Sequence, residues 1–203
     1  MIKVVLFDID GTLIDSVRAN WKFHKFLNKK YGGRKLALNE YKKKFFSKTM
    51  REMIHACCPH LTEKELDEAC IFGASVYHTF HRFIKLKRNA RGLLGKLSRK
   101  FKLGVVTARI ETGILDYFDL EKFFTHQITA KDYKNSKPDP EPLLVAVKKF
   151  GVKPEEAVYI GDQWNDAEAG KNSGVRTILL NGEAKGDYNV KDISEVQGII
   201  ENL

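Results

Sequence analysis

The sequence predicts an α/β fold, a Rossmann-like doubly wound parallel sheet that carries an inserted α-helical domain. The first observation is the continuous apolar run of residues 4–7, which is typical of a strand buried on both faces. The second is the alternation of helical and strand patterns after Arg91, which indicates a parallel sheet covered by helices. The third is the segment between them, where apolar residues recur at helical spacing. We therefore expect a Rossmann-like core of residues 1–15 and 90–203 and a helical domain of residues 16–89.

The expected elements follow from periodicity and from start and stop signals. In the helical domain we expect helices over 17–31, 40–57 and 63–87, the last one opened by a capping box of Thr62 and Glu65. In the core we expect helices over 92–101, 110–118, 138–150, 166–173 and 193–203, and strands over 103–107, 127–129, 157–161 and 176–180. Prolines open the helix 138–150, and Gly151 and Gly174 end two of these helices.

Composition limits the class of protein. The chain has 203 residues, of which 43% are hydrophobic and 30% charged, as in a soluble globular protein with one core of ordinary size. The sequence contains no apolar run of about 18 residues, so we expect no membrane span, and its first residues do not resemble a secretion signal. Cys57, Cys58 and Cys70 form an odd set without zinc-ligand spacing. We expect free thiols and a cytoplasmic location.

The positive charge is concentrated in one segment. The formal net charge is +9, and residues 15–90 contain 17 Lys and Arg against 7 Asp and Glu. A basic domain of this kind would attract anions. The sequence has no recognisable nucleic-acid-binding motif, so we expect a small phosphorylated substrate and no specific binding of nucleic acid.

Polar side chains gather where the expected strands end. They are Asp8 and Asp10 after the first strand, Thr107 after the second, Lys137 in a later loop, and Asp162 and Asp166 after the strand 157–161. The carboxyl ends of parallel strands meet in one crevice. Carboxylates there can hold Mg²⁺, while a lysine and a hydroxyl can balance the charge of a phosphoryl group. An aspartate can also be the attacking nucleophile. The set therefore favours phosphoryl transfer.

Four motifs give the chain a family resemblance. They are Asp8-Ile9-Asp10-Gly11-Thr12-Leu13, Val105-Val106-Thr107, Lys137-Pro138-Asp139-Pro140 and Gly161-Asp162-Gln163-Trp164-Asn165-Asp166. In order and spacing they resemble the motifs of the haloacid-dehalogenase-like (HAD) hydrolases. The helical insertion resembles the α-helical cap of the phosphoglycolate-phosphatase-like branch of that superfamily.

The resemblance implies a role for each motif residue. Asp8 would be the nucleophile that attacks phosphorus, and Asp10 would be the general acid and base. Thr107 and Lys137 would hold the phosphoryl oxygens. Mg²⁺ would be bound by the Asp8 carboxylate, the main-chain carbonyl of Asp10 and Asp162. Asp166 would help through water or by positioning Lys137.

Substrate contacts are expected from both domains. The candidates are Gly11, Thr12, Ala108 and Arg109 in the core, and Arg18 and Arg51 in the cap. Many relatives carry a small polar residue after the motif threonine, whereas Ala108 and Arg109 follow here. Arg109 therefore adds a positive charge that the family pattern does not require.

The expected function is a Mg²⁺-dependent phosphomonoester hydrolase that acts through an aspartyl-phosphate. Its substrate would be a small metabolite such as a phosphoglycolate-like acid, a sugar phosphate or a nucleotide, and the protein would be a monomer or a homodimer. Two alternatives stay open at this point. One is a phosphosugar mutase on the same core, and the other is a non-catalytic binding protein on a retained fold.

Overall fold

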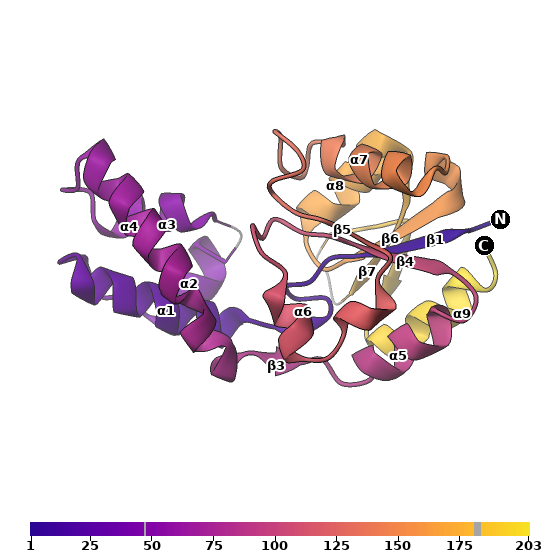
Figure 1. Ribbon diagram of the computed structural model, residues 1–203, viewed down its shortest axis with the longest axis horizontal. Helices are drawn as coiled ribbons and strands as arrows, with labels where there is room; N and C mark the ends of the chain where they lie inside the picture. Colours follow the sequence, from indigo (N-terminus) through magenta and orange to yellow (C-terminus); the bar gives the residue numbers. More distant parts are fainter. Residues whose placement is uncertain (47, 181–183) are drawn as a thin grey trace. The chain divides into compact units, whose positions relative to one another are not determined.

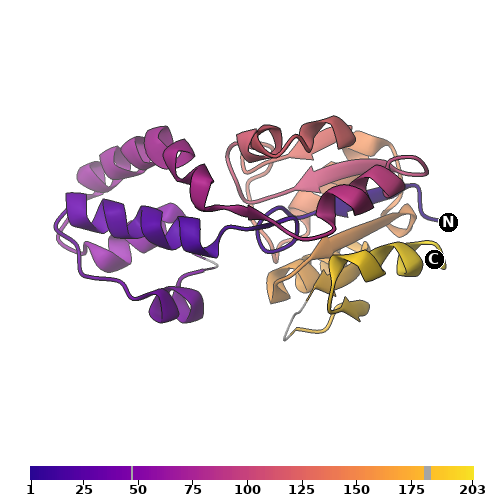
Figure 2. The same ribbon diagram turned by 90° about the horizontal axis from the view of Figure 1, so that it is seen from below.

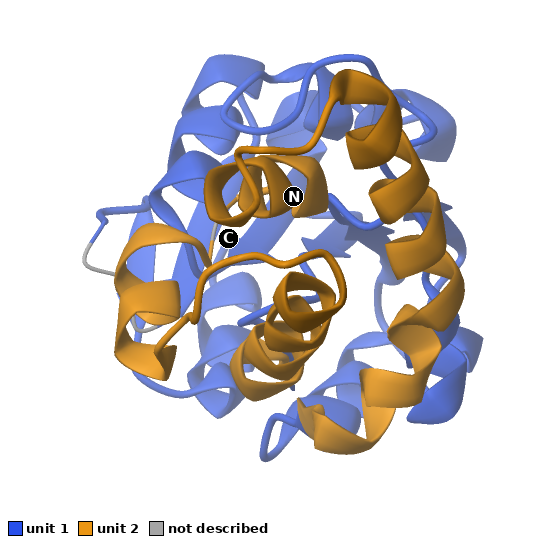
Figure 3. Cartoon of the chain, turned by 90° about the vertical axis from the view of Figure 1, so that its left-hand side faces the viewer, with its two compact units in different colours: residues 1–14, 86–203 blue, residues 15–85 orange. Residues whose placement is uncertain are grey.

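The chain forms two compact units, which are described separately here. The computed structural model describes residues 1–46, 48–180 and 184–203. Residues 1–14 and 86–203 form one unit, the sheet unit, and residues 15–85 form the other, the helical unit (Figure 3). The boundaries expected from the sequence are 15/16 and 89/90, and the two units divide at 14/15 and 85/86.

The sheet unit contains a six-stranded sheet in the order β5-β4-β1-β6-β7-β8. Its strands are β1 (Val4–Phe7), β4 (Lys102–Val106), β5 (His126–Ile128), β6 (Ala157–Gly161), β7 (Arg176–Leu180) and β8 (Tyr188–Val190). Every neighbouring pair is parallel, with Phe7 opposite Val105 on one side and Ile160 on the other. The order is that of a Rossmann-type doubly wound sheet, so the predicted fold class is confirmed. Its direction of winding reverses between β1 and β6.

Helices cover both faces of this sheet. The helices of the sheet unit are α5 (Ala90–Leu97), α6 (Gly113–Tyr117), α7 (Glu141–Phe150), α8 (Trp164–Ser173) and α9 (Val196–Ile200), with 3₁₀ turns η2 (Glu121–Phe123), η3 (Pro154–Glu156) and η4 (Ile193–Glu195). Helices α7 and α8 lie on one face, and α5 and α9 lie on the other (Figures 1 and 2). All four residues of β1 are fully buried, as the continuous apolar run predicts. The predicted stops are confirmed, because Gly151 and Gly174 have positive φ values of 67° and 75° just after α7 and α8.

The helical unit has its own core. Its helices are α1 (Val17–Lys30), α2 (Leu38–Lys44), α3 (Met50–Cys57) and α4 (Glu63–Val76), followed by the 3₁₀ segment η1 (Tyr77–Phe83). Phe23 and Leu27 of α1 pack in one buried cluster with Met53, Ile54 and Leu66 of the following helices. This shared apolar cluster is what allows the segment to form a compact unit.

Two expected helices of this unit differ from the structure. The expected helix 40–57 is two helices, α2 and α3, because Thr49 has an extended backbone conformation and caps α3 in a capping box with Glu52. The expected helix 63–87 begins as predicted with the Thr62–Glu65 capping box, but it ends at Val76 and continues as η1.

The two chain crossings between the units are extended. They are β2 (Ile14–Asp15) and β3 (Lys85–Leu86), which pair as a two-stranded sheet.

Cys57, Cys58 and Cys70 are free thiols. Among the helices in the described ranges, none combines the length and apolar character needed to cross a bilayer.

Candidate active site

A tight turn after β1 places Asp8 and Asp10. The backbone N–H of Leu13 donates to the carbonyl of Ile9 at 2.9 Å, and that of Gly11 donates to the carbonyl of Ile14 at 2.8 Å. Gly11 has φ +81°, and a Cβ there would collide with the carboxylate of Asp162. Position 11 therefore requires glycine for two reasons, its positive φ and the close approach of the Asp162 carboxylate.

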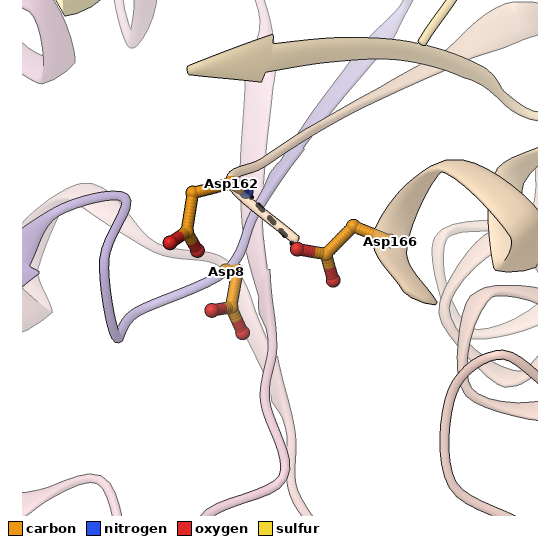
Figure 4. A group of neighbouring side chains, drawn as sticks. All are labelled: Asp8, Asp162 and Asp166. Carbon is orange, nitrogen blue, oxygen red and sulfur yellow. Dashed lines mark hydrogen bonds between the residues drawn. The ribbon is translucent and has the colours of Figure 1, made fainter. Parts of the chain in front are cut away.

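Three carboxylates converge at the carboxyl ends of β1 and β6. Asp8 follows β1, Asp162 follows β6, and Asp166 lies in the first turn of α8. One oxygen of each lies within 4.8 Å of the others (Figure 4). Because β1 and β6 flank the point where the winding reverses, the cluster occupies the usual ligand position of an open α/β sheet.

Lys137 is the cation of this cluster. Its Nζ atom donates to Asp8 Oδ1 at 3.2 Å, to Asp166 Oδ1 at 2.6 Å and to the hydroxyl of Tyr159 at 2.6 Å. Only 6% of the Lys137 side chain is exposed, so these contacts take the place of water around the ammonium group. The structure thus brings Lys137 to Asp8 and Asp166, although 129 residues separate it from Asp8 in the sequence.

The electrostatics of the cluster suit a bound cation. Burial raises the pKa of Asp8 well above its ordinary value, Lys137 opposes this rise, and Asp166, Asp10 and Asp162 add to it. Burial is also the main reason why the pKa of Asp162 rises to about 6. Burial alone would lower the pKa of Lys137, but Asp166 and Asp8 outweigh it and raise that pKa well above its ordinary value. Three crowded acids with one lysine leave negative charge that a divalent ion would neutralise.

One orphaned atom supports the same interpretation. Asp162 Oδ1 is buried and has no hydrogen-bond partner within the described part of the chain, while Oδ2 accepts from Gln163 Nε2 at 2.8 Å. Hard carboxylate oxygens are the donors that Mg²⁺ prefers. Asp8, Asp162 and Asp166 therefore fit a divalent metal ion by number, charge and donor type.

Asp166 has two structural tasks. Its Oδ1 accepts from Lys137, and its Oδ2 accepts from the backbone N–H groups of Asp162 and Gln163, each at 3.0 Å. The second pair of bonds caps the start of α8 and fixes the loop that carries Asp162. Asp166 is thus bonded to both Lys137 and the Asp162 loop.

Thr107 lies on the opposite side of β1 from Asp162, at the end of β4. Its side chain is buried, and Tyr133 donates its hydroxyl proton to the Thr107 carbonyl at 2.9 Å. The backbone N–H of Arg109 donates to Thr107 Oγ1 at 3.2 Å. Ala108 between them is exposed. The loop after β4 is therefore fixed on both sides of Ala108.

Arg109 forms an ion pair with Asp10. Its Nε donates to Asp10 Oδ2 at 2.5 Å and one terminal nitrogen donates to Asp10 Oδ1 at 2.7 Å. Both side chains are largely covered, with 13% of Arg109 and 25% of Asp10 exposed. The carboxylate of Asp10 is thus bonded to Arg109 at its two oxygens.

The remaining expected substrate contacts are in different surroundings. Thr12 is fully buried, and its hydroxyl has no hydrogen-bond partner among the described residues. Arg18 is exposed on α1. Arg51 on α3 is bonded to Glu63 at 2.5 Å and to Asp67.

The sequence reasoning missed Tyr159. This residue is fully buried in β6, and its hydroxyl contacts Lys137 Nζ and lies 3.1 Å from Asp166 Oδ1. A signal was present in the sequence. A tyrosine in an otherwise aliphatic strand, three residues before a motif aspartate, needs a buried partner for its hydroxyl group.

Comparison with known proteins gives one consistent result. The family model described as haloacid dehalogenase-like hydrolase matches residues 5–180. Pyrophosphatase PpaX of Bacillus pumilus is 30% identical, over 98% of this chain and 96% of the relative. A HAD-superfamily hydrolase of subfamily IA from Geobacter sulfurreducens is 27% identical with a TM-score of 0.79, covering 98% of this chain and 96% of that one.

A second solved structure shows the same fold at lower identity. It is that of a predicted phosphoglycolate phosphatase from Haemophilus somnus, with a TM-score of 0.89, 21% identity and 98% of each chain covered. The family match spans the turn with Asp8 and Asp10, the ends of β4 and β6, and the helical segment between the first two core strands. The chain therefore belongs to the haloacid dehalogenase-like hydrolase family.

Proposed function

We propose that this protein is a Mg²⁺-dependent phosphohydrolase that acts through an aspartyl-phosphate on Asp8. The observation that carries the proposal is the cluster of Asp8, Asp162 and Asp166, in which Asp8 and Asp166 are bonded to the Nζ atom of Lys137. Asp8, Asp162 and the main-chain carbonyl of Asp10 would hold the metal ion. Asp166 would help through water or by positioning Lys137. When bound, Mg²⁺ neutralises carboxylate and phosphoryl charge in the cluster.

In the first step, a carboxylate oxygen of Asp8 attacks phosphorus and the bond from phosphorus to the leaving oxygen breaks. Lys137 and Thr107 stabilise the charge on the phosphoryl oxygens during this transfer. An alkoxide leaving group requires a proton, which Asp10 donates.

In the second step, water hydrolyses the aspartyl-phosphate. Asp10 removes a proton from the water, whose oxygen attacks phosphorus, and the bond between phosphorus and Asp8 breaks. The products are inorganic phosphate and the regenerated Asp8 carboxylate. Burial of Asp8, of which 7% is exposed, limits its contact with bulk water between the two steps.

We propose a small phosphorylated metabolite as substrate, such as a phosphoglycolate-like acid, a sugar phosphate or a nucleotide. The basic character of residues 15–90 is consistent with an anionic substrate. Inorganic pyrophosphate is a second candidate. It is favoured by relatives from Bacillus pumilus and Bacillus cereus that carry the name pyrophosphatase PpaX and match this chain over 98% and 100% of its length.

The experiment measures phosphate release from these four substrate types, with and without Mg²⁺, by the wild type and by Asp8→Asn. We expect Mg²⁺-dependent release by the wild type and a loss of at least about 10³-fold in Asp8→Asn, because the amide cannot attack phosphorus. Acid-quenched wild-type protein should also carry one phosphoryl group on the peptide that contains Asp8.

Asp119→Asn is the matched control, because Asp119 is an exposed carboxylate of the same unit that pairs with Arg91 and Lys122. It should retain wild-type activity. Isomerised sugar phosphate without net phosphate release would identify a mutase instead. Metal binding without turnover of any substrate would identify a non-catalytic protein.

A further inference from the structure

We infer that Arg109 determines which leaving group the site accepts, and that it favours a second phosphate, as in a diphosphate. This inference rests on the proposed phosphohydrolase function. It assigns to one residue the recognition of the part of the substrate that departs, as distinct from the phosphoryl group that is transferred to Asp8.

Lys137 and Arg109 are bonded to different carboxylates. Lys137 Nζ donates to Asp8, Asp166 and Tyr159, so it is engaged on the side of the nucleophile. Arg109 is bonded to Asp10, the residue that acts on the leaving group in the proposed reaction. The positive charge of Arg109 therefore lies on the leaving-group side.

The position of Arg109 is fixed by its backbone. Its N–H donates to Thr107 Oγ1 at 3.2 Å, and its carbonyl accepts from the N–H of Ala130 at 2.9 Å. These backbone bonds fix the loop that carries Arg109, two residues beyond Thr107, which is expected to hold the transferred phosphoryl group. The bonds to Asp10 hold the guanidinium itself, so the side chain loses little further conformational freedom when it binds a ligand.

The contact with Asp10 indicates which chemistry Arg109 can bind. Arg109 presents two N–H donors to two oxygens of one planar carboxylate. As the general acid of the proposed reaction, Asp10 must be protonated, and this weakens its ion pair with Arg109. The same donor pair can then bind two oxygens of a phosphate, and a lysine cannot reproduce that geometry. With 13% of the side chain exposed, its charge is screened less than that of a surface arginine.

The charges around Asp10 also favour an arginine on this side of the site. Asp8, Asp10, Asp162 and Asp166 supply four acidic groups, and Lys137 is bonded to Asp8 and Asp166. A diphosphate brings a further phosphate to the Asp10 side, where repulsion from the acids would be strong without Arg109. In the reaction, Asp8 attacks one phosphorus, the bridging P–O bond breaks, and the electron pair leaves with the second phosphate.

The test compares substrates that differ in leaving-group charge. The wild type, Arg109→Ala and Arg109→Lys are assayed with Mg²⁺ on pyrophosphate, phosphoglycolate and p-nitrophenyl phosphate. The leaving group of pyrophosphate is a phosphate, and that of phosphoglycolate carries a carboxylate. The leaving group of p-nitrophenyl phosphate carries no additional anionic group. For Arg109→Ala we expect kcat/KM to fall about 30-fold or more on pyrophosphate and less than about threefold on p-nitrophenyl phosphate. Phosphoglycolate should lie between them, and Arg109→Lys should be intermediate on pyrophosphate.

A binding measurement separates recognition from chemistry. In Asp8→Asn, which cannot form the phosphoenzyme, the added Arg109→Ala change should raise the dissociation constant of pyrophosphate about tenfold or more and that of inorganic phosphate less than about threefold. Arg91→Ala is the matched control, because Arg91 pairs with the exposed Asp119 of the same unit. In the same Asp8→Asn background, Arg91→Ala should change neither the dissociation constant of pyrophosphate nor that of inorganic phosphate.

Several outcomes would overturn the inference. Equal losses on pyrophosphate and p-nitrophenyl phosphate would make Arg109 a general phosphate-binding or structural residue. Unchanged kinetics of Arg109→Ala on pyrophosphate would show that Arg109 does not recognise the leaving phosphate. If Arg109→Ala does not fold, Arg109→Lys decides, since a uniform effect on all three substrates contradicts the inference. Failure of the proposed function appears separately, as wild-type protein without phosphate release or as Asp8→Asn protein that retains it.

Discussion

The buried ion pairs of the sheet unit and the exposed ion pairs of the helical unit join the same kinds of side chain in opposite surroundings. In the sheet unit, Lys137 is bonded to Asp8 and Asp166, and at most 10% of each of these side chains is exposed. In the helical unit, Lys48 pairs with Glu52 at 49% and 48% exposure. Exposed pairs are screened and exchange easily with water, whereas buried ions depend on their partners. The difference predicts that substitutions in the buried ion pairs of the sheet unit have large effects, and that substitutions in the exposed ion pairs of the helical unit have small ones.

The largest expected effect is that of Lys137→Met. It leaves Asp8 and Asp166 buried without their ammonium partner, so kcat should fall about 10³-fold and the metal-free protein should lose about 3 kcal/mol of unfolding free energy. Phosphate release and urea unfolding measure the two effects. Lys48→Met is the matched change in the helical unit and should alter neither quantity measurably. A loss of activity below tenfold in Lys137→Met would contradict the contrast between the units.

One buried group of the helical unit is expected to break this pattern. His24 is 6% exposed, lies between Phe23 and Tyr41, and its Nδ1 has no hydrogen-bond partner in the ranges that the structure describes. Burial lowers the pKa of His24 from 6.5 to about 4. Between these values the unfolded chain binds a proton that the folded chain does not. The stability that His24 contributes is therefore present above pH 6.5 and is lost as the pH falls toward 4.

Replacing His24 with Leu should remove an acid-dependent loss of about 3 kcal/mol between pH 6.5 and 4. The chain has two tryptophans, and Trp21 lies in the helical unit, where its Nε1 donates to the Leu36 carbonyl at 2.8 Å. In a Trp164→Phe background, Trp21 fluorescence can follow urea unfolding of this unit at each pH. His55→Leu, a change at an exposed histidine of α3, should keep the acid-dependent loss. The same pH dependence in His24→Leu as in its parent would refute the prediction.

Tyr159→Phe tests whether a neutral buried hydroxyl group of the sheet unit also contributes to kcat. The substitution removes the hydroxyl that accepts from Lys137 at 2.6 Å and leaves the buried ring in place. We expect kcat to fall about tenfold with little change in KM, because the loss of one acceptor lets Lys137 move relative to Asp8. Tyr188→Phe, at an exposed edge strand, should retain wild-type kinetics. An effect on KM alone would show that Tyr159 contributes to substrate binding instead.

The parts of this protein that could be predicted from sequence are those with local signals. The strand of β1 is a continuous apolar run, and α7 and α8 end at Gly151 and Gly174. The parallel sheet follows from alternation of such elements. It also places Asp8 and Asp162 together, because strand ends of one sheet share an edge.

The features that the sequence reasoning missed differ in how much local signal they carry. Strand β8 is three residues long and two of them are exposed, so it lacks an apolar pattern. The break before α3 had a readable signal, since Thr49 and Glu52 have the spacing of a capping box. The contact of Arg109 with Asp10 joins residues 99 positions apart. Local periodicity carries no information on such a pair, which depends on where two loops meet after the sheet has formed.

The smallest expected effect is that of Arg51→Ala in the helical unit. Arg51 links α3 to α4 through Glu63 and Asp67, and all three side chains are at least 44% exposed. Solvent screening and side-chain entropy offset most of the attraction between such ions, so the midpoint of thermal unfolding should fall by about 1 °C or less. Because the two carboxylates together more than offset the single charge of Arg51, we also expect KM for the best substrate to change less than about twofold. A tenfold rise in KM would make Arg51 a substrate contact, as expected for this residue from the sequence, and would show that exposed cations of the helical unit take part in binding.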